Sequence, residues 1–348
     1  MTTIFCIRPK GLNIGNEVIY LGTQHFLRKA FGEEVNLVSL PSTSKYGCDR
    51  AGLTAKTIYE INQYGHGVII GGGNLYENGE LEVDLDALEA LEVPLMLLSL
   101  SRGRVYNRRN ELVDRTDAMP ARVIMALHRK ASLSLARDVA TGEYLDSLGC
   151  NNQVGGCPSM FLTQVPSQTV YDKSSVLISI RNPSLMSVPM QKQAQVRSDL
   201  LEIIALLRTK GFSKIRFLCH DKRDIPFAAS FAEVDYVYTE DVYAYLSLLY
   251  SCTLNISYRL HATIPCLVFG VPTIKICYDE RALSFMRTVG FGEWSINMIH
   301  SSNVVAEVAN RFERLVVLED LRTLARSEWY RFHAATTNAF TEFAKEIL

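Results

Sequence analysis

The stretch Val68-Ile69-Ile70-Gly71-Gly72-Gly73-Asn74-Leu75 joins a run of β-branched residues to three glycines and a polar side chain. A short, wholly apolar run is typical of a strand that is buried on both faces of a parallel sheet. Glycines directly after such a strand allow unusual backbone angles and the close approach of a ligand. We therefore predict a strand at residues 67–70 and a turn in which Gly71, Gly72, Gly73 and Asn74 line a ligand-binding cleft. A plain flexible turn is the alternative.

Similar apolar runs alternate with segments of helical periodicity along the whole chain. In the first half we predict strands at residues 4–8, 35–40, 67–70, 95–100 and 132–136, and helices at 17–31, 54–63, 83–90, 120–130 and 141–148. In the second half we predict strands at 175–181, 214–219, 234–238, 253–257 and 273–277, and helices at 190–209, 242–251, 261–269, 280–289 and 304–315. Alternation of strand and helix indicates an α/β layered fold.

The length of 348 residues favours two domains, since a domain has roughly 100–200 residues. A segment rich in Pro, Ser, Thr and Gln, residues 163–169, separates the two halves and is predicted to be a linker. We predict doubly wound, Rossmann-like α/β domains at 1–165 and 166–325 that face each other across a cleft. A helix at 326–348, within a helical pattern that begins near residue 320, would pack back on the first domain. Ligands of such folds bind at the carboxyl ends of the strands.

The composition excludes several classes of protein. The formal net charge is −1, with 48% hydrophobic and 21% charged residues, which argues against a disordered chain, a highly charged nucleic-acid binder and a multi-span membrane protein. No apolar run approaches the ~20 residues that span a bilayer, and the first residues lack the pattern of a signal peptide. The eight cysteines are scattered, without a C-x-x-C pair, as expected in a reducing compartment. We expect a cytoplasmic enzyme with no metal, no organic cofactor and no nucleic-acid partner.

The loop after the first predicted strand, Lys10-Gly11-Leu12-Asn13-Ile14-Gly15-Asn16, also carries polar residues at a strand end. Asn13 or Asn16 can cap the following helix, where free backbone N–H groups favour an anion or a sugar hydroxyl. The loop does not match G-x-G-x-x-G, and Gly71–Gly73 lack the Lys-Ser/Thr ending of a phosphate-binding loop. Neither segment therefore indicates a dinucleotide or ATP site, and a simple capped turn is the alternative for the first.

Cationic residues follow strands of the second half. Ser257-Tyr258-Arg259-Leu260-His261 follows an apolar strand and opens a helix, so Arg259 and His261 would lie at a helix N-terminus, which attracts anions. His261 can exchange a proton near neutral pH. Arg181 ends the first strand of the second domain, and His220 follows the next one. Two arginines that converge on one cleft would suit a small ligand with two or three negative charges, although a salt bridge is the alternative for Arg181.

These residues resemble the polysaccharide pyruvyl transferase family over about residues 1–300. The most specific match is Ser257-x-Arg259-Leu260-His261-Ala262-x-Ile264, followed by Phe269-Gly270-Val271-Pro272-Thr273-Ile274 and Tyr278-Asp279. Leu135-Ala136-Arg137-Asp138, Gly155-Gly156-Cys157-Pro158-Ser159 and Asn13-Ile14-Gly15-Asn16 are similar to further elements of the family. Asn16 stands where the family has an acidic residue, which would alter the preference for an acceptor.

The resemblance implies a GT-B-like pair of domains and a reaction. A pyruvyl group would pass from phosphoenolpyruvate, a co-substrate, to two hydroxyls of a sugar, giving a ketal and phosphate for exopolysaccharide or another cell-envelope polymer. His261 would be the acid/base, and Arg259, Arg181, Leu260 and Ser257 would bind the donor. The residues Asn13, Gly15, Asn16, Gly71, Gly72, Gly73, Asn74 and His220 would bind the acceptor or line the cleft.

Two other readings compete with this interpretation, a nucleotide-sugar glycosyltransferase of the same architecture and a non-catalytic sugar-binding relative. The acceptor sugar is not identified by the sequence, and a lipid-linked acceptor would bring the protein to the inner face of the membrane as a peripheral protein. A homo-oligomer is left open.

Overall fold

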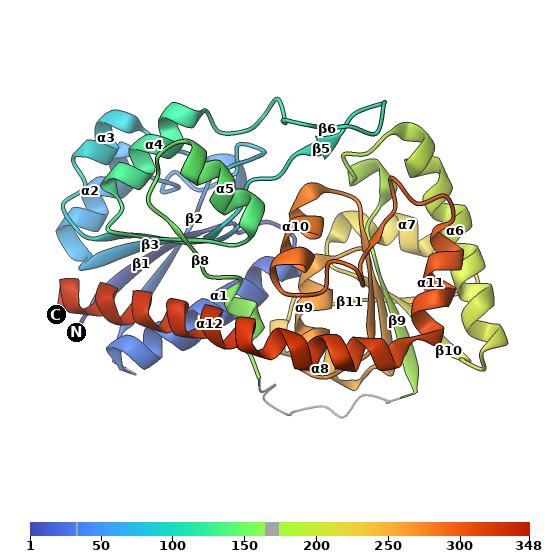
Figure 1. Cartoon of the computed structure of the whole chain (residues 1–348). Helices are drawn as coiled ribbons and strands as arrows, with labels where there is room; N and C mark the ends of the chain where they lie inside the picture. Colours follow the sequence, from blue (N-terminus) through green and yellow to red (C-terminus); the bar gives the residue numbers. More distant parts are fainter. Residues whose placement is uncertain (33, 164–173) are drawn as a thin grey trace.

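The computed structural model describes residues 1–32, 34–163 and 174–348. Its first half forms a six-stranded sheet in the order β2-β1-β3-β4-β7-β8, with every neighbouring pair parallel (Figure 1). The strands are β1 (Thr3–Arg8), β2 (Asn36–Pro41), β3 (Gly67–Gly73), β4 (Leu95–Leu100), β7 (Leu133–Ala136) and β8 (Gln153–Val154). The helices of this half are α1 (Ile14–Phe31), α2 (Ala55–Tyr64), α3 (Leu85–Glu89), α4 (Ala121–Lys130) and α5 (Val139–Ser147).

The second half forms another parallel sheet in the order β11-β10-β9-β12-β13-β14. Its strands are β9 (Ser175–Ile180), β10 (Lys214–Cys219), β11 (Asp235–Tyr238), β12 (Leu254–Ser257), β13 (Thr273–Cys277) and β14 (Ile296–Asn297). Its helices are α6 (Met190–Thr209), α7 (Ile225–Ala229), α8 (Val242–Ser251), α9 (Leu260–Val268), α10 (Glu280–Thr288) and α11 (Val304–Glu313). The predicted fold class, two parallel α/β sheets, is confirmed.

Side chains alternate between the two faces of the first sheet. Phe5, Ile7, Val68 and Ile70 belong to a core with residues of α2, α3, α4 and α5. The intervening residues of the same strands, such as Ile4 and Ile69, point to the opposite face. Because both faces are covered by helices, the strands read as continuous apolar runs in the sequence.

The structure differs from the predicted elements at several places. Strand β3 continues through the glycines to Gly73, because Gly71 pairs with Leu98 and Gly73 with Leu100 of β4. A hairpin of β5 (Val105–Tyr106) and β6 (Leu112–Val113) was not predicted, since each strand has only two residues. Of the predicted linker, residues 164–169 lie outside the described part of the chain.

Helix α12 (Leu315–Ile347) begins before residue 320 and runs along both halves of the molecule (Figure 1). Leu318 and Ala325 belong to the core of the second half. Phe340 and Phe343 belong to the core of the first half, where the Phe340 ring stacks on Phe26 with centroids 5.3 Å apart. The helix therefore completes both cores.

Replacing Phe343 by Ala should lower the free energy of unfolding by about 3–5 kcal/mol, as is usual for a phenylalanine removed from a core. The ring is 0% exposed and packs in the core beneath the first sheet. Leu324→Ala is the matched control on the same helix, because Leu324 is 75% exposed and should change stability by no more than about 0.5 kcal/mol. Urea denaturation measures both, and equal stabilities of the two variants would contradict the packing described.

Candidate functional site

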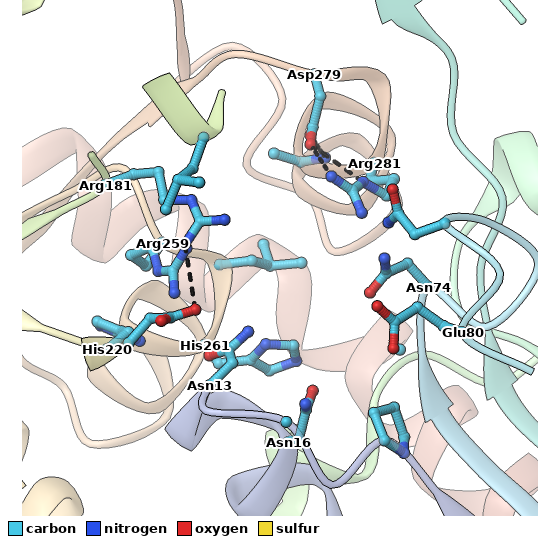
Figure 2. A pocket seen from close by; sticks show the side chains of 18 of the residues that line it. Asn13, Asn16, Asn74, Glu80, Arg181, His220, Arg259, His261, Asp279 and Arg281 are labelled. Carbon is cyan, nitrogen blue, oxygen red and sulfur yellow. Dashed lines mark hydrogen bonds and ion pairs between the residues drawn. The ribbon is translucent and has the colours of Figure 1, made fainter. Parts of the chain in front are cut away.

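A cavity of about 450 Å³ lies between the carboxyl edges of the two sheets (Figure 2). In the first sheet β1 and β3 are neighbours, and the chain passes from β1 to β2 on one side and from β3 to β4 on the other. In the second sheet β9 and β12 are neighbours in the same way, since they lead to β10 and β13 on opposite sides. Such a switch point leaves a crevice in which ligands of open α/β sheets bind. The loops after these four strands, together with those after β10 and β13, supply most of the lining.

The turn between β12 and α9 is held by its own serine. The Ser257 hydroxyl donates to the carbonyl of Arg259 at 2.7 Å and accepts from the Arg259 N–H at 3.0 Å. Arg259 is the N-cap residue of α9, so Leu260 and His261 occupy the first turn. The N–H groups of a first turn have no partner within the helix, and they add a positive end to this wall of the cavity.

Pro265 determines how the carbonyl of His261 is bonded. A proline has no N–H, so it cannot bond the carbonyl four residues earlier, which is that of His261. The Tyr245 hydroxyl donates to this carbonyl at 2.9 Å. Because that hydroxyl has one proton, its 3.1 Å contact with His220 Nε2 is made by the histidine as donor. His220 is thus engaged in supporting α9, although it lines the cavity.

His261 is packed closely on both sides. A Cβ atom on Gly15 of α1 would lie 2.9 Å from both Cβ and Nδ1 of His261, so no larger residue fits there without a shift. On the other side, Nε2 is 3.7 Å from the Cys157 Sγ. Burial, aided by the charges of Arg137, Arg259 and Lys275, lowers the pKa of His261 to about 3. The imidazole is therefore neutral at pH 7 when no ligand is bound.

Three arginines of the lining have buried guanidinium nitrogens with no hydrogen-bond partner among the described residues: Arg137 Nε, Arg181 Nε and Arg259 Nη2. Arg259 is only 7% exposed, and its Nη2 lies 3.6 Å from Asp224 Oδ2, beyond hydrogen-bond distance. Burial and the nearby Arg259 lower the pKa of Arg181. Buried cations that repel one another and lack full hydrogen bonding would be stabilised by an anion.

Further charged groups surround these arginines. Arg281 bonds Asp279 at 2.5 Å and lies 3.4 Å from the buried Glu77. Lys275 is fully buried behind the Arg259 turn, where its Nζ donates to the carbonyls of Ser257 and Ile276. Burial lowers the pKa of Lys275 to about 8. The second-half wall of the cavity is therefore strongly cationic.

Nine of the predicted site residues line the cavity: Asn13, Asn16, Gly73, Asn74, Arg181, His220, Arg259, Leu260 and His261. The other four, Gly15, Gly71, Gly72 and Ser257, are not among the residues that line it. Gly15 makes room for His261, and Ser257 holds the Arg259 backbone. Gly72 has φ +77°, and a Cβ there would lie 2.2 Å from Ile19 of α1, so this glycine serves helix packing.

Several lining residues were absent from the predicted site: Tyr46, Glu80, Arg115, Arg137, Asp279 and Arg281. A signal existed for Arg137, because it follows the apolar strand β7 as Arg181 follows β9. Tyr46 and Glu80 lie in loops of ordinary polar composition, which give no such signal.

A sequence model of polysaccharide pyruvyl transferases matches residues 13–280, a range that contains Arg137, Arg181, Arg259 and His261. The chain belongs to the polysaccharide pyruvyl transferase family. Members of this family are transferases that act on saccharides, which fits a cleft lined by polar side chains. A comparison with curated proteins found no match.

Solved structures share the architecture of this family member. A putative UDP-N-acetylglucosamine 2-epimerase from Listeria monocytogenes aligns with a TM-score of 0.58 at 10% identity, over 93% of this chain and 90% of that one. The UDP-GlcNAc 2-epimerase of Methanocaldococcus jannaschii, in complex with UDP-GlcNAc and UDP, aligns with a TM-score of 0.56 at 13% identity, over 89% and 92%. The likeness establishes a GT-B-like fold.

Among the described residues, no helix is both long and apolar enough to cross a membrane. These residues also contain no group of three or more His, Cys, Asp and Glu side chains arranged to hold a metal ion.

Gly15→Ala should lower transferase turnover strongly, because the added methyl group would displace the His261 ring. Alanine normally stabilises a helix relative to glycine by about 0.5–1 kcal/mol, so the fold should survive the change. Steady-state kinetics and circular dichroism measure the two effects. Unchanged turnover in a folded Gly15→Ala protein would contradict the importance of this contact.

Proposed function

We propose that this protein transfers a pyruvyl group from phosphoenolpyruvate to two hydroxyls of a saccharide, forming a ketal and releasing phosphate. The observation that supports it is the convergence of Arg137, Arg181 and Arg259 on one cavity with unsatisfied buried nitrogens. Phosphoenolpyruvate carries a carboxylate and a phosphate close together. Each of these groups is a good partner for a planar guanidinium.

The donor would lie against the second-half wall of the cleft. Arg259 and Arg181 come from adjacent strand ends, and Arg137 approaches from the first half. The free N–H groups of the first turn of α9 would bond the phosphate. Leu260 lies between the arginine and the histidine and would contact the apolar carbons of the donor.

His261 would protonate the methylene carbon of the donor. Burial, together with the charges of Arg137, Arg259 and Lys275, lowers the pKa of His261 and holds its imidazole neutral in the free protein. A bound trianion offsets those charges, so the pKa of His261 should rise when the donor binds. The histidine would then take up a proton only when a donor is present.

The acceptor would enter from the first-half side of the cleft, where Asn13, Asn16 and Asn74 lie (Figure 2). Donor and acceptor would thus occupy facing walls. Phosphoenolpyruvate is a cytoplasmic metabolite, so the reaction would take place in the cytoplasm, and at the inner membrane face if the acceptor is lipid-linked.

The affinity for phosphoenolpyruvate provides a direct test. Arg259→Gln should weaken binding by at least about 30-fold, the equivalent of roughly 2 kcal/mol for a buried charge partner. Isothermal titration calorimetry measures the affinity. Arg208→Gln is the matched control, because Arg208 is half exposed and pairs with Glu233 at the surface.

UDP, GDP and inorganic phosphate should be titrated in parallel, because the Methanocaldococcus jannaschii enzyme of similar fold binds UDP. Binding of a nucleotide without binding of phosphoenolpyruvate would refute the proposed donor and favour a nucleotide-sugar glycosyltransferase. Binding of phosphoenolpyruvate without phosphate release in the presence of any saccharide would favour a sugar-binding relative.

The role of His261 predicts proton uptake on donor binding. Since the pKa of His261 is about 3 in the free protein and should rise in the complex, binding should take up protons, and affinity should increase as the pH falls towards the pKa of the complex. Calorimetry in buffers of different ionisation enthalpy measures the uptake. His261→Gln should bind phosphoenolpyruvate with less proton uptake than the wild type. The same uptake in both proteins would remove His261 from this role.

A further inference from the structure

Glu80 differs from the other two carboxylates that line the cavity. Asp221 bonds Arg223 at 2.5 Å and lies 3.4 Å from Arg181. Asp279 bonds Arg281. Within the described ranges Glu80 has no cationic partner, and its side chain accepts one hydrogen bond, from the Tyr46 hydroxyl at 2.8 Å. The Glu80 carboxylate lies on the first-half wall of the cavity, opposite His261, and can accept further hydrogen bonds there (Figure 2).

Two loops fix Glu80 and Tyr46 in place. Lys45 Nζ donates to the carbonyls of Asn78 and Gly79 at 2.8 and 3.0 Å, which ties the Tyr46 loop to the Glu80 loop. Glu82 strengthens the link by accepting hydrogen bonds from Thr43 and Ser44. The carboxylate and the phenol are therefore preorganised, which reduces the entropy lost when a ligand binds.

The Tyr46 ring lies at the mouth of the cavity with the residue 40% exposed. A Cβ on Gly11 would lie 2.8 Å from the Tyr46 hydroxyl oxygen, so this glycine leaves space for the ring. An exposed aromatic face beside a carboxylate suits a sugar, whose C–H groups pack on a ring while its hydroxyls donate to an acceptor.

Two of the arginines that line the cavity are paired, Arg115 of the first half and Arg281 of the second. Arg115 bonds Asp117 and Asn78, and Arg281 bonds Asp279. Around Glu80 the first-half wall therefore presents a carboxylate and neutral amides, such as Asn16 and Asn74, whereas the unsatisfied Nε of Arg137, also from the first half, belongs to the anion site. Such a wall accepts an uncharged sugar and repels one that carries a carboxylate.

We propose that Glu80 and Tyr46 form the subsite for the acceptor, that the acceptor is a neutral sugar with two free hydroxyls, and that Glu80 accepts a hydroxyl proton. This proposal rests on the proposed function. Tyr46 orients the Glu80 carboxylate and packs on the sugar ring, and Asn16 and Asn74 bond its other hydroxyls.

Ketal formation releases hydroxyl protons from the sugar, and Glu80 can accept one of them. When the first hydroxyl oxygen bonds C2 of the donor, the methylene carbon gains a proton, and that hydroxyl loses one. When the C2–phosphate bond breaks and the second hydroxyl oxygen bonds C2, a second proton leaves the sugar and the released phosphate gains one. Glu80 takes the second hydroxyl proton and passes it to the phosphate, directly or through water, so the carboxylate is regenerated.

Saturation-transfer NMR on the full chain with phosphoenolpyruvate bound tests the subsite. The probes are methyl glucopyranoside, methyl galactopyranoside, methyl mannopyranoside and methyl glucuronide. We expect transfer to at least one of the neutral glycosides and none to the glucuronide. Glu80→Gln should weaken the binding of that glycoside by about tenfold or more, as for the loss of a hydrogen bond to a charged group.

Two further variants complete the test. Tyr46→Ala should also weaken glycoside binding, and Glu89→Gln, a surface carboxylate in the same half of the molecule, should not. The affinity for phosphoenolpyruvate should stay within about threefold of the wild type in Glu80→Gln, Tyr46→Ala and Glu89→Gln, since none of these residues belongs to the anion site.

The outcomes separate this proposal from the proposed function. If the wild type fails to bind phosphoenolpyruvate, the proposed function is wrong. If it binds phosphoenolpyruvate but no neutral glycoside, or if Glu80→Gln binds the glycoside as well as the wild type does, the subsite is wrong while the donor site stands. Preferred binding of the glucuronide would likewise overturn the subsite.

Discussion

The candidate site depends on the close approach of two helices from different halves of the chain. Helix α1 meets α9 where Gly15 lies against His261, and Ile14 N–H donates to the carbonyl of His220 at 3.0 Å. One heptad further along α1, Gly22 lies against Pro158 so closely that a Cβ would be 2.5 Å from the proline carbonyl oxygen. A side chain at either glycine would force its neighbour to shift. This contact brings the carboxyl edges of the two sheets within reach of one ligand.

The electrostatics of the cleft follow from this assembly. Each half alone would present one or two arginines at a strand end, where water could solvate them. In the assembled cleft Arg137, Arg181 and Arg259 each have a buried nitrogen without a hydrogen-bond partner among the described residues. Burial, together with the charges of Arg137, Arg259 and Lys275, lowers the pKa of His261. Leaving these nitrogens without hydrogen bonds costs free energy, and an anion in the cleft would offset that cost.

The sequence was sufficient for the fold and for part of the site. Continuous apolar runs such as residues 95–100 identify buried parallel strands, and polar residues directly after them, such as Arg181 and Arg259, fall at the cavity. The roles of the glycines were harder to predict, because the sequence does not distinguish a glycine that contacts a ligand from one that allows a helix to pack closely. Gly72 proved to serve α1, and Gly15 serves His261. Tyr46 and Glu80 could not be predicted, since their proximity depends on two loops whose contact is tertiary.

Helix α12 has a consequence for how the protein is made. It follows every strand of both sheets in the chain, yet it supplies Ala339, Phe340 and Phe343 to the core beneath the first sheet. During synthesis, which proceeds from the N-terminus at about 5–20 residues per second, the apolar face carrying Ile4 and Ile69 is covered by α1 alone on this side until α12 has left the ribosome, so this core stays incomplete. The N-terminal half therefore cannot finish folding before the C-terminal half has been translated. Docking of α12 is therefore a late step that completes both halves together.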